Sequence, residues 1–222
     1  MELLENIQID IEPEAVKKTL RLDSIETAHA LIQTARPHIR AKAVYRVSYV
    51  DQKFPDAVQL DGVRFTSRVL RKNLDKIERV FPYVVTIGPA LENTASSCDD
   101  LLDQYYLDEI GNLAVVGARK QLDRHLRQHF GLGKISKMSP ESLKDWPINE
   151  QKKLFSILGD VESSLGVTLT PSFLMIPRKS LSGIYFPSEI PFLSCQLCPR
   201  QSCPSRQAAF DHKLAEKYRI EP

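Results

Sequence analysis

Between Leu169 and Phe186 the chain reads LTPSFLMIPRKSLSGIYF, an extended pattern that two prolines interrupt. Pro171 and Pro177 lack the N–H group that a strand donates to its neighbours, so they do not suit the middle of a sheet. Ser180, Ser182 and Gly183 are small, and small residues let a ligand approach the backbone closely. The pattern predicts an extended segment with an accessible backbone, although an edge hairpin with solvated charges would also account for it.

The charged and aromatic side chains of the same segment suit a small ligand. Arg178 and Lys179 carry positive charges that can bind a carboxylate. Tyr185 adds an aromatic face and a hydroxyl group. We therefore take this segment as the first candidate binding element.

The rest of the chain mixes strand and helix patterns, which favours an α/β protein. The expected strands are Ala43–Val50 and Val80–Ile87, with a hairpin turn at Asp61-Gly62; the expected helices are one behind Ser67, Leu101–Phe130, one from about Pro147, and a short polar one from about Ser205 to Lys217. Gly111 and Gly117 lie inside the long helix, where each costs about 1 kcal/mol relative to alanine. Close approach of a strand or of a neighbouring backbone would explain them, and a kink is the alternative.

Composition and charge exclude several classes of protein. The 222 residues are 42% hydrophobic, which is enough for one sizeable core, and 30 Lys and Arg against 28 Asp and Glu leave a formal charge of +2. So balanced a charge does not suit a dedicated binder of nucleic acid or of an anionic membrane. The chain has no apolar run of about 18 residues and begins with MELLENIQID, which is not a signal peptide, so we expect a cytoplasmic protein.

Three of the four cysteines cluster near the end of the chain, as Cys195-x2-Cys198-x4-Cys203. Thiolates at this spacing can converge on a zinc ion or an iron–sulfur cluster, although unmodified thiols are the alternative. Cys98, His212, a partner or a non-protein ligand could occupy the fourth position. The cluster is therefore a candidate metal site whose metal the spacing does not identify.

Other motifs are missing or weak. The sequence has no G-x-G-x-x-G after a strand, no G-x-x-x-x-G-K-[ST] and no G-x-S-x-G, which argues against a dinucleotide site, a P-loop ATPase and a serine hydrolase. His125 and His129 stand four apart on the expected long helix, where a solvated basic face explains them better than a metal site.

The segment Leu169–Phe186 resembles the signature L-T-E-S-F-x-M-x-P-x-x-S-x-S-G-x-Y-F of the C-terminal activation domain of vitamin B12-dependent methionine synthase. That domain binds S-adenosylmethionine and presides over the reductive remethylation of oxidised cobalamin. Val84–Glu92 and Met138–Gln151 are similar to two further stretches of the family. Together the matches cover most of the chain from about residue 63 to 187.

The resemblance implies a fold and a division of the chain. We expect a single α/β domain of the α+β type, with a twisted, mostly antiparallel sheet flanked by long helices. Residues 1–187 would form this activation-domain-like part, and residues 188–222 a Cys-rich C-terminal extension.

The resemblance also implies a binding site for S-adenosylmethionine, without a catalytic nucleophile. The family has an Arg-x-x-x-Gly-Tyr pattern where this chain has Lys137 and the residues after it, and a lysine keeps the charge without the planar fork of arginine. Pro171 replaces the usual Glu of the signature. The implied binding residues are Lys137, Ser139, Pro140, Arg178, Ser182, Gly183 and Tyr185.

The implied function is accessory. Nothing in the chain resembles the cobalamin-binding D-x-H-x-x-G motif, so the cobalamin would be carried by a partner, either a corrinoid protein or a methionine synthase without its activation domain. A low-potential electron donor would be the second partner. Because zinc has no redox chemistry, this function favours an iron–sulfur cluster at Cys195, Cys198 and Cys203. The alternatives are a scaffold protein of the same fold with a structural zinc and an iron–sulfur electron-transfer module.

Overall fold

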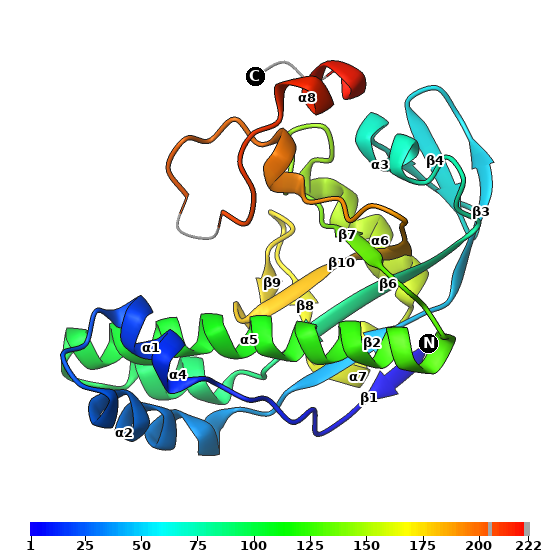
Figure 1. The fold of residues 1–222 in the computed structure, drawn as a ribbon. Helices are drawn as coiled ribbons and strands as arrows, with labels where there is room; N and C mark the ends of the chain where they lie inside the picture. The colour runs from blue at the N-terminus through cyan, green and yellow to red at the C-terminus, as the bar shows by residue number, and fades with distance from the viewer. Residues whose placement is uncertain (204–205, 220–222) are drawn as a thin grey trace.

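One antiparallel sheet of eight strands runs through the computed structural model, which describes residues 1–203 and 206–219 (Figure 1). The strands are β1 (Glu2–Leu4), β2 (Lys42–Tyr45), β3 (Ser48–Lys53), β4 (Ala57–Leu60), β5 (Val63–Thr66), β6 (Arg79–Thr86), β7 (Ile135–Met138) and β10 (Ser180–Pro187). Two short strands, β8 (Thr168–Leu169) and β9 (Met175–Ile176), form a separate hairpin. The prediction of a mixed α/β domain with an antiparallel sheet is confirmed.

The central strand is β6, which pairs with β2 and β3 along one edge and with β10 along the other. β2 and β3 continue in the same register against β6, so the predicted strand Ala43–Val50 is nearly correct. It divides at Arg46, whose N–H donates to the carbonyl of Pro82 over 3.0 Å. Pro82 has no N–H to return that bond, and the ladder is therefore interrupted there.

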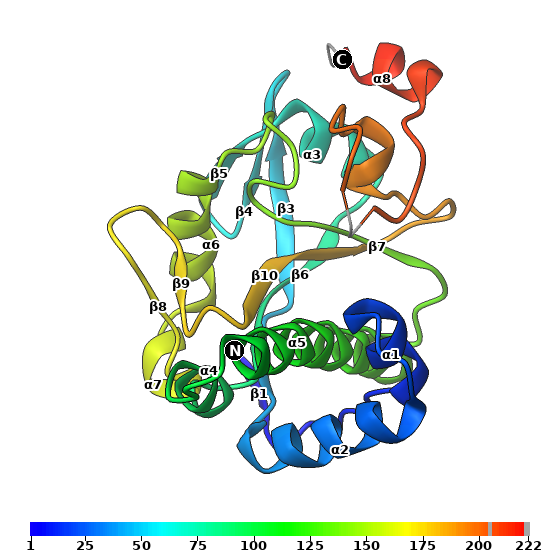
Figure 2. The same cartoon turned by 90° about the vertical axis from the view of Figure 1, so that its left-hand side faces the viewer.

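Helices cover both faces of the sheet, which explains why seven of the eight residues of β6 are buried. On one face lie α1 (Pro13–Leu20), α2 (Ile25–Ala35), α4 (Ala90–Ser96) and α5 (Leu101–Phe130), with a 3₁₀ turn at Arg36–His38. On the other lie α3 (Arg68–Asn73), α6 (Gln151–Leu158), α7 (Val161–Leu165) and α8 (His212–Tyr218), with 3₁₀ turns at Ile148–Glu150 and Ser194–Leu197. Figure 2 shows α1, α2 and α5 on one side and α3 and α8 on the other.

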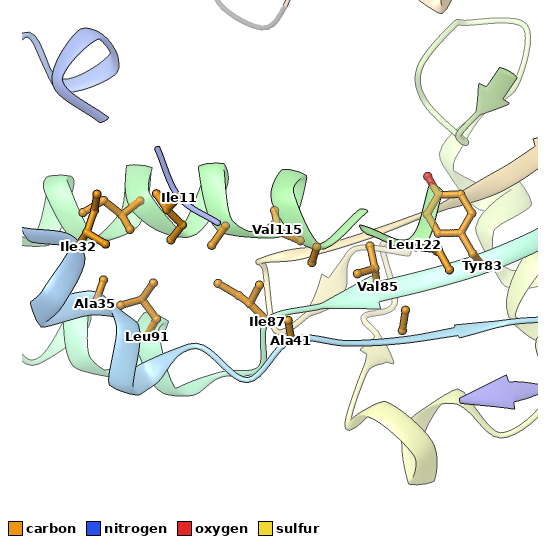
Figure 3. Close-up of a cluster of buried hydrophobic side chains, with 14 of the residues drawn as sticks. Ile11, Ile32, Ala35, Ala41, Tyr83, Val85, Ile87, Leu91, Val115 and Leu122 are labelled. Carbon is orange, nitrogen blue, oxygen red and sulfur yellow. The ribbon is translucent and has the colours of Figure 1, made fainter. Parts of the chain in front are cut away.

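The α5 face holds the first of two buried clusters. Val85 and Tyr83 of β6 belong to it together with Val115 and Leu122 of α5 (Figure 3). At Gly117 an added Cβ would lie 2.7 Å from a methyl carbon of Ile9, so the segment before α1 approaches the helix closely. The close neighbour of Gly117 is therefore a side chain, and not the strand or backbone that the sequence suggested.

The second cluster lies on the α6 face and includes residues from the end of the chain. Phe192, Leu197, Ala215 and Tyr218 are buried in it, so the segment after Pro187 packs into the same core as the sheet. The sequence analysis had set residues 188–222 apart as a C-terminal extension.

Two predicted helices differ from those observed. The helix expected from Pro147 begins as a 3₁₀ turn and breaks at Gly159, where φ is +86° and an α-helix cannot continue. The C-terminal helix begins at His212, because the Asp211 side chain accepts a hydrogen bond from the Leu214 N–H. Ser205, its expected start, lies outside the described residues.

The turn at Asp61-Gly62 is confirmed: both residues have positive φ, and they join β4 to β5. Within the described residues, no helix combines the length and the apolar character that a membrane span requires.

Candidate functional site

A cavity of about 390 Å³ opens where the loop after β7 crosses β10, beside α6. Four of the residues that the resemblance implied line it: Ser139, Pro140, Arg178 and Ser182. The other residues of its wall are Ile148, Gln151, Leu174, Met175, Ser180 and Leu181. The structure thus brings together residues that lie up to 43 positions apart in the sequence.

Hydrogen bonds hold the two sides of this cavity in place. The Ser182 hydroxyl donates to the Gln151 side-chain oxygen over 2.9 Å, and the Gln151 amide group donates to the Phe173 carbonyl over 3.0 Å. The Ser139 hydroxyl donates to the Ser182 carbonyl over 2.7 Å. These bonds tie the loop, the strand and the start of α6 into one polar wall.

Gly183 lies in the tightest part of this crossing. An added Cβ would overlap the Met138 carbonyl oxygen and would lie 2.8 Å from the Ser139 hydroxyl and 3.1 Å from the Tyr83 hydroxyl. The sequence suggested that small residues here admit a ligand, and at Gly183 it is instead the protein's own loop that comes close.

Lys137 and Tyr185 are directly opposite each other in the β7–β10 ladder. Successive side chains of a strand alternate between faces, and Tyr185 belongs to the buried cluster on the α5 face, away from Ser182 and α6. Its ring stacks on that of Tyr83 at 4.7 Å, and its hydroxyl donates to the Arg119 carbonyl over 3.3 Å. These two implied residues therefore lie on the other side of β10 from the cavity.

The α5 face also contains polar atoms that lack a partner. The Tyr83 hydroxyl and the Arg119 Nε are buried without a hydrogen bond within the described part of the chain. Buried polar groups in proteins are nearly always paired. Burial raises the pKa of both Tyr83 and Tyr185, so both phenols stay protonated at neutral pH.

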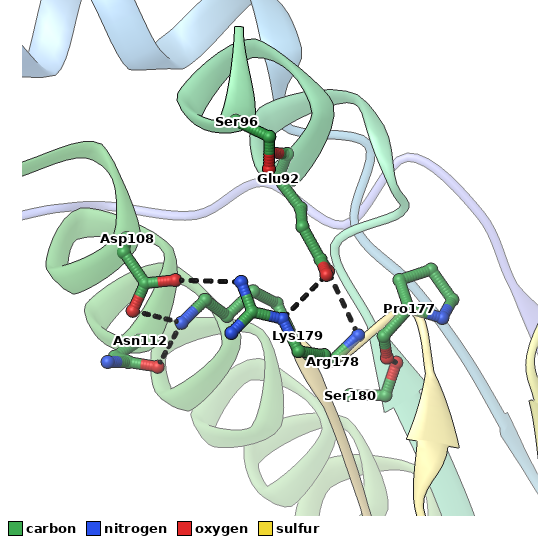
Figure 4. A network of polar contacts seen from close by, with 8 residues as sticks. All are labelled: Glu92, Ser96, Asp108, Asn112, Pro177, Arg178, Lys179 and Ser180. Atoms are coloured by element: carbon green, nitrogen blue, oxygen red, sulfur yellow. Dashed lines mark hydrogen bonds and ion pairs between the residues drawn. The ribbon is translucent and has the colours of Figure 1, made fainter. Parts of the chain in front are cut away.

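Arg178 lines the cavity, and its guanidinium group forms ion pairs with two carboxylates of the protein itself (Figure 4). Its Nε lies 2.6 Å from Glu92 Oε1, its backbone N–H donates to the same carboxylate over 3.0 Å, and its Nη2 lies 3.3 Å from Asp108. The pKa of Arg178 is raised chiefly by the hydrogen bond to Glu92. The anionic partner that the sequence suggested for Arg178 is thus intramolecular.

Lys179 belongs to the same network. Its side chain is only 8% exposed, and its ammonium group lies 2.8 Å from both Asp108 Oδ2 and Asn112 Oδ1. The aliphatic part of Lys179 packs where Gly111 leaves room on α5: an added Cβ would lie 3.2 Å from its Cε. The network therefore attaches the start of β10 to α4 and α5.

The cysteines do not gather into a metal-binding set in the described structure. In residues 1–203 and 206–219, no three His, Cys, Asp or Glu side chains lie close enough to hold a metal ion. The loop that carries Cys195 and Cys198 is organised by Arg206, whose guanidinium donates to the carbonyls of both residues over 3.2 Å and also to the Arg200 carbonyl. The metal site stays a prediction from the spacing.

The two helical histidines have other neighbours. Their rings stack with centroids 5.4 Å apart, and His125 Nε2 lies 3.1 Å from the Tyr45 hydroxyl. The pKa of His125 is lowered, chiefly by burial, so the face that carries it is only partly solvated.

The sequence missed Gln151 and Met175 as parts of the cavity. Gln151 is the first residue of α6. Its sequence context suggests an ordinary polar surface residue, but its side chain is buried. Met175 lies within the quoted segment and could have been included for that reason. Their roles depend on the packing of α6 and the β8–β9 hairpin against β10, which no local pattern encodes.

Comparisons with known proteins show which known fold this chain resembles. No protein-family model matches the sequence, and a search of curated protein sequences found no significant relative. Among solved structures, the chain is similar to a crystal structure of the MetH reactivation domain bound to AdoHcy, with a TM-score of 0.58 and 14% sequence identity. The match covers 87% of this chain and 80% of the other.

The chain therefore has the α/β fold of a reactivation domain. The particular domain that it resembles is that of MetH, in agreement with the resemblance of its sequence to the activation domain of vitamin B12-dependent methionine synthase.

Proposed function

We propose that this chain binds S-adenosylmethionine in the cavity beside Ser182 and supports, in the cytoplasm, the remethylation of a cobalamin held by a separate polypeptide. The observation that carries the proposal is the meeting of Ser139, Pro140, Arg178 and Ser182 around one cavity. It is supported by the similarity to a reactivation domain bound to AdoHcy, the product that S-adenosylmethionine becomes after methyl transfer.

The cavity has the character that this ligand needs. Its volume of about 390 Å³ lies within the range of about 300 to 1,000 Å³ that is usual for small-molecule sites. Ile148, Leu174 and Met175 provide apolar wall for a nucleoside. Gln151 and Ser182 provide hydrogen-bonding groups for its polar edges. This mixture of apolar wall and a few fixed polar groups is typical of nucleoside-binding cavities.

The Tyr83 hydroxyl on the α5 face, which has no hydrogen-bond partner among the described residues, is a second candidate contact for the ligand. The Tyr83 hydroxyl lies beside Gly183 and Ser139, directly behind the crossing that forms the cavity. Variants of residues on each side of β10 therefore test which face of the strand contacts the ligand.

When bound, S-adenosylmethionine supplies an activated methyl group for a reduced cobalamin. The chain's own residues bind and orient the ligand and exclude water from the site. The hydrogen bonds of Ser139 and Ser182 fix the cavity wall, which limits the freedom of a bound molecule. No side chain has to act as an acid or base in such a transfer.

The partners are part of the proposal. The cobalamin would come from a corrinoid protein or from a methionine synthase that lacks its own activation domain. An electron donor of low potential would reduce that cobalamin before each methyl transfer. The chain would then be an accessory to a methyltransferase.

A reconstitution experiment tests the function. A methionine synthase fragment without its reactivation domain is prepared with oxidised cobalamin and supplied with titanium(III) citrate and S-adenosylmethionine. We expect the full chain to promote the appearance of methylcobalamin, followed by its absorption spectrum, and Ser182→Ala to slow it. Ser156→Ala, which changes an exposed serine of α6, is the matched control. Formation of methylcobalamin at the same rate with and without the chain would refute the proposal and favour the scaffold alternative.

A further inference from the structure

A second cavity, of about 710 Å³, lies between α3, α8 and the segment Phe186–Ile190, which begins at the end of β10. It shares no residue with the cavity beside Ser182. Figure 1 shows α3 and α8 near each other at the upper end of the molecule. The Tyr218 hydroxyl donates to the Asn73 side-chain oxygen over 3.1 Å and joins the two helices.

The charges around this cavity do not cancel. Arg71 pairs with Asp75 at 2.8 Å, which neutralises both. Lys72, Lys76 and Lys217 also line the cavity, against the single carboxylate of Glu189. Within residues 1–203 and 206–219, no carboxylate lies within ion-pair distance of these three lysines. Among the residues that the structure describes, three cations against one anion leave an excess of two positive charges.

Lys72 is held at the centre of this positive region. Its ammonium group donates to the Lys217 carbonyl and lies 5.3 Å from the centre of the Tyr218 ring. Burial lowers the pKa of Lys72, and the nearby Arg219, Arg68 and Lys217 lower it further. An ammonium group crowded by like charges is stabilised when an anion binds beside it.

We propose that this cavity binds a small molecule bearing a phosphate group, with Lys72, Lys76 and Lys217 contacting the phosphate. The excess of two positive charges matches the charge of about −1.5 to −2 that a phosphate monoester carries near pH 7. Apolar wall from Ile77, Pro187 and the Tyr218 ring lies beside the lysines and suits the rest of such a molecule. The size of the cavity lies within the usual range for nucleotide-sized ligands.

A small ligand fits these observations better than a nucleic acid. An extended polyanion is bound by a long stripe of positive charge, whereas here three lysines line one cavity that Glu189 and Asp75 also line. The whole chain carries a formal charge of only +2. The site is independent of the proposed function, because neither its residues nor its ligand take part in methyl transfer.

The probes for this site are inorganic phosphate and pyrophosphate, titrated calorimetrically into the full chain. We expect pyrophosphate to bind more tightly than phosphate, since it carries more charge. The double variant Lys76→Gln with Lys217→Gln should weaken pyrophosphate binding at least about tenfold. Both side chains are exposed, so the fold should persist, which thermal melting verifies. Lys152→Gln, an exposed lysine on α6 outside the cavity, should leave the affinity unchanged.

Three results would overturn the proposal. They are the absence of pyrophosphate binding at millimolar concentration, an affinity that the double variant does not change, and tighter binding of a single-stranded RNA than of pyrophosphate. S-adenosylmethionine is titrated into the same variants. The cavity proposed for S-adenosylmethionine shares no residue with the lysine-lined cavity, so the lysine variants should bind S-adenosylmethionine as the wild type does. The two titrations therefore distinguish a failure of the phosphate site from a failure of the proposed function.

Discussion

Ser182 and Tyr185, three positions apart on β10, contact helices on opposite faces of the sheet. The Ser182 hydroxyl bonds to Gln151 of α6, and the Tyr185 hydroxyl bonds to the Arg119 carbonyl of α5. The residues that the family resemblance groups together are thus divided by the strand that carries them. This division makes it possible to test each side of β10 separately.

The crossing at Gly183 gives a prediction for stability. Gly183→Ala should destabilise the fold by about 1–3 kcal/mol, because its Cβ would overlap the Met138 carbonyl. Gly133→Ala is the control, since an added Cβ there meets nothing within 4 Å. Urea denaturation of both variants measures the difference. Equal stability of the two variants would mean that β7 and β10 do not approach as closely as described.

The buried tyrosines give a prediction for alkaline pH. Burial first, and Tyr83 second, raise the pKa of Tyr185 well above the ordinary value of 10.0. Above pH 10.0 the unfolded chain loses a proton that the folded protein keeps. The free energy of unfolding should therefore be insensitive to this group below that pH and decrease above it. Tyr185→Phe should make the decrease shallower.

The measurement is urea denaturation at a series of pH values from 8 to 11, an interval that brackets the ordinary tyrosine pKa of about 10. Tyr105→Phe, at a half-exposed position of α5, controls for the loss of a tyrosine. If Tyr185→Phe and Tyr105→Phe gave the same slope as the wild type, the assignment to Tyr185 would be wrong.

The network at the start of β10 gives a third prediction. Asp108→Asn removes the carboxylate that lies 2.8 Å from the buried Lys179 ammonium. Leaving a buried charge without its partner costs about 3–5 kcal/mol in full burial, and because Asp108 is partly exposed we expect about 1–3 kcal/mol. Asp99→Asn, an exposed site without such a partner, should cost much less. Thermal unfolding compares them, and similar melting temperatures for the two variants would contradict the role given to Asp108.

The cysteine spacing gives a fourth prediction, that of a metal site, which the structure does not test. An iron–sulfur cluster at Cys195, Cys198 and Cys203 would require the loop around Arg206 to rearrange, because no three ligands converge among the described residues. Iron, sulfide and zinc are measured in protein prepared without oxygen, with Cys198→Ala plus Cys203→Ala as the comparison. The cluster predicts iron and sulfide that this variant loses. Stoichiometric zinc without iron, or iron retained by the variant, would contradict it.

The sequence predicted the elements of the fold more completely than the site. The bounds Leu101–Phe130 and the buried strand near Val80–Ile87 follow from strong local periodicity, which the observed α5 and β6 confirm. Which face of β10 each side chain meets depends on the packing of α6 and α5, far away in the chain. The sequence therefore grouped Ser139 and Ser182, which line one cavity, but could not tell that Tyr185 lies on the other side of β10 or that Gln151 lies beside them.

The intramolecular partners of Arg178 illustrate the same limit. A basic pair in a strand suggests an external anion, since nothing in the local sequence provides one. Glu92 and Asp108 reach Arg178 from two helices that precede it by at least 70 positions, and only the tertiary structure shows that they satisfy its charge.

Calorimetric titration of S-adenosylmethionine into the wild type, Ser182→Ala, Tyr185→Phe and the control Ser156→Ala shows whether the cavity beside Ser182 binds this ligand. We predict binding to the wild type with a dissociation constant in the micromolar range, about −8 kcal/mol. Ser182→Ala should weaken it about tenfold or more, whereas Tyr185→Phe and Ser156→Ala should leave it within about twofold. Loss of binding in Tyr185→Phe with full binding in Ser182→Ala would move the site to the α5 face. The absence of binding to the folded wild-type protein would contradict the proposed binding of S-adenosylmethionine.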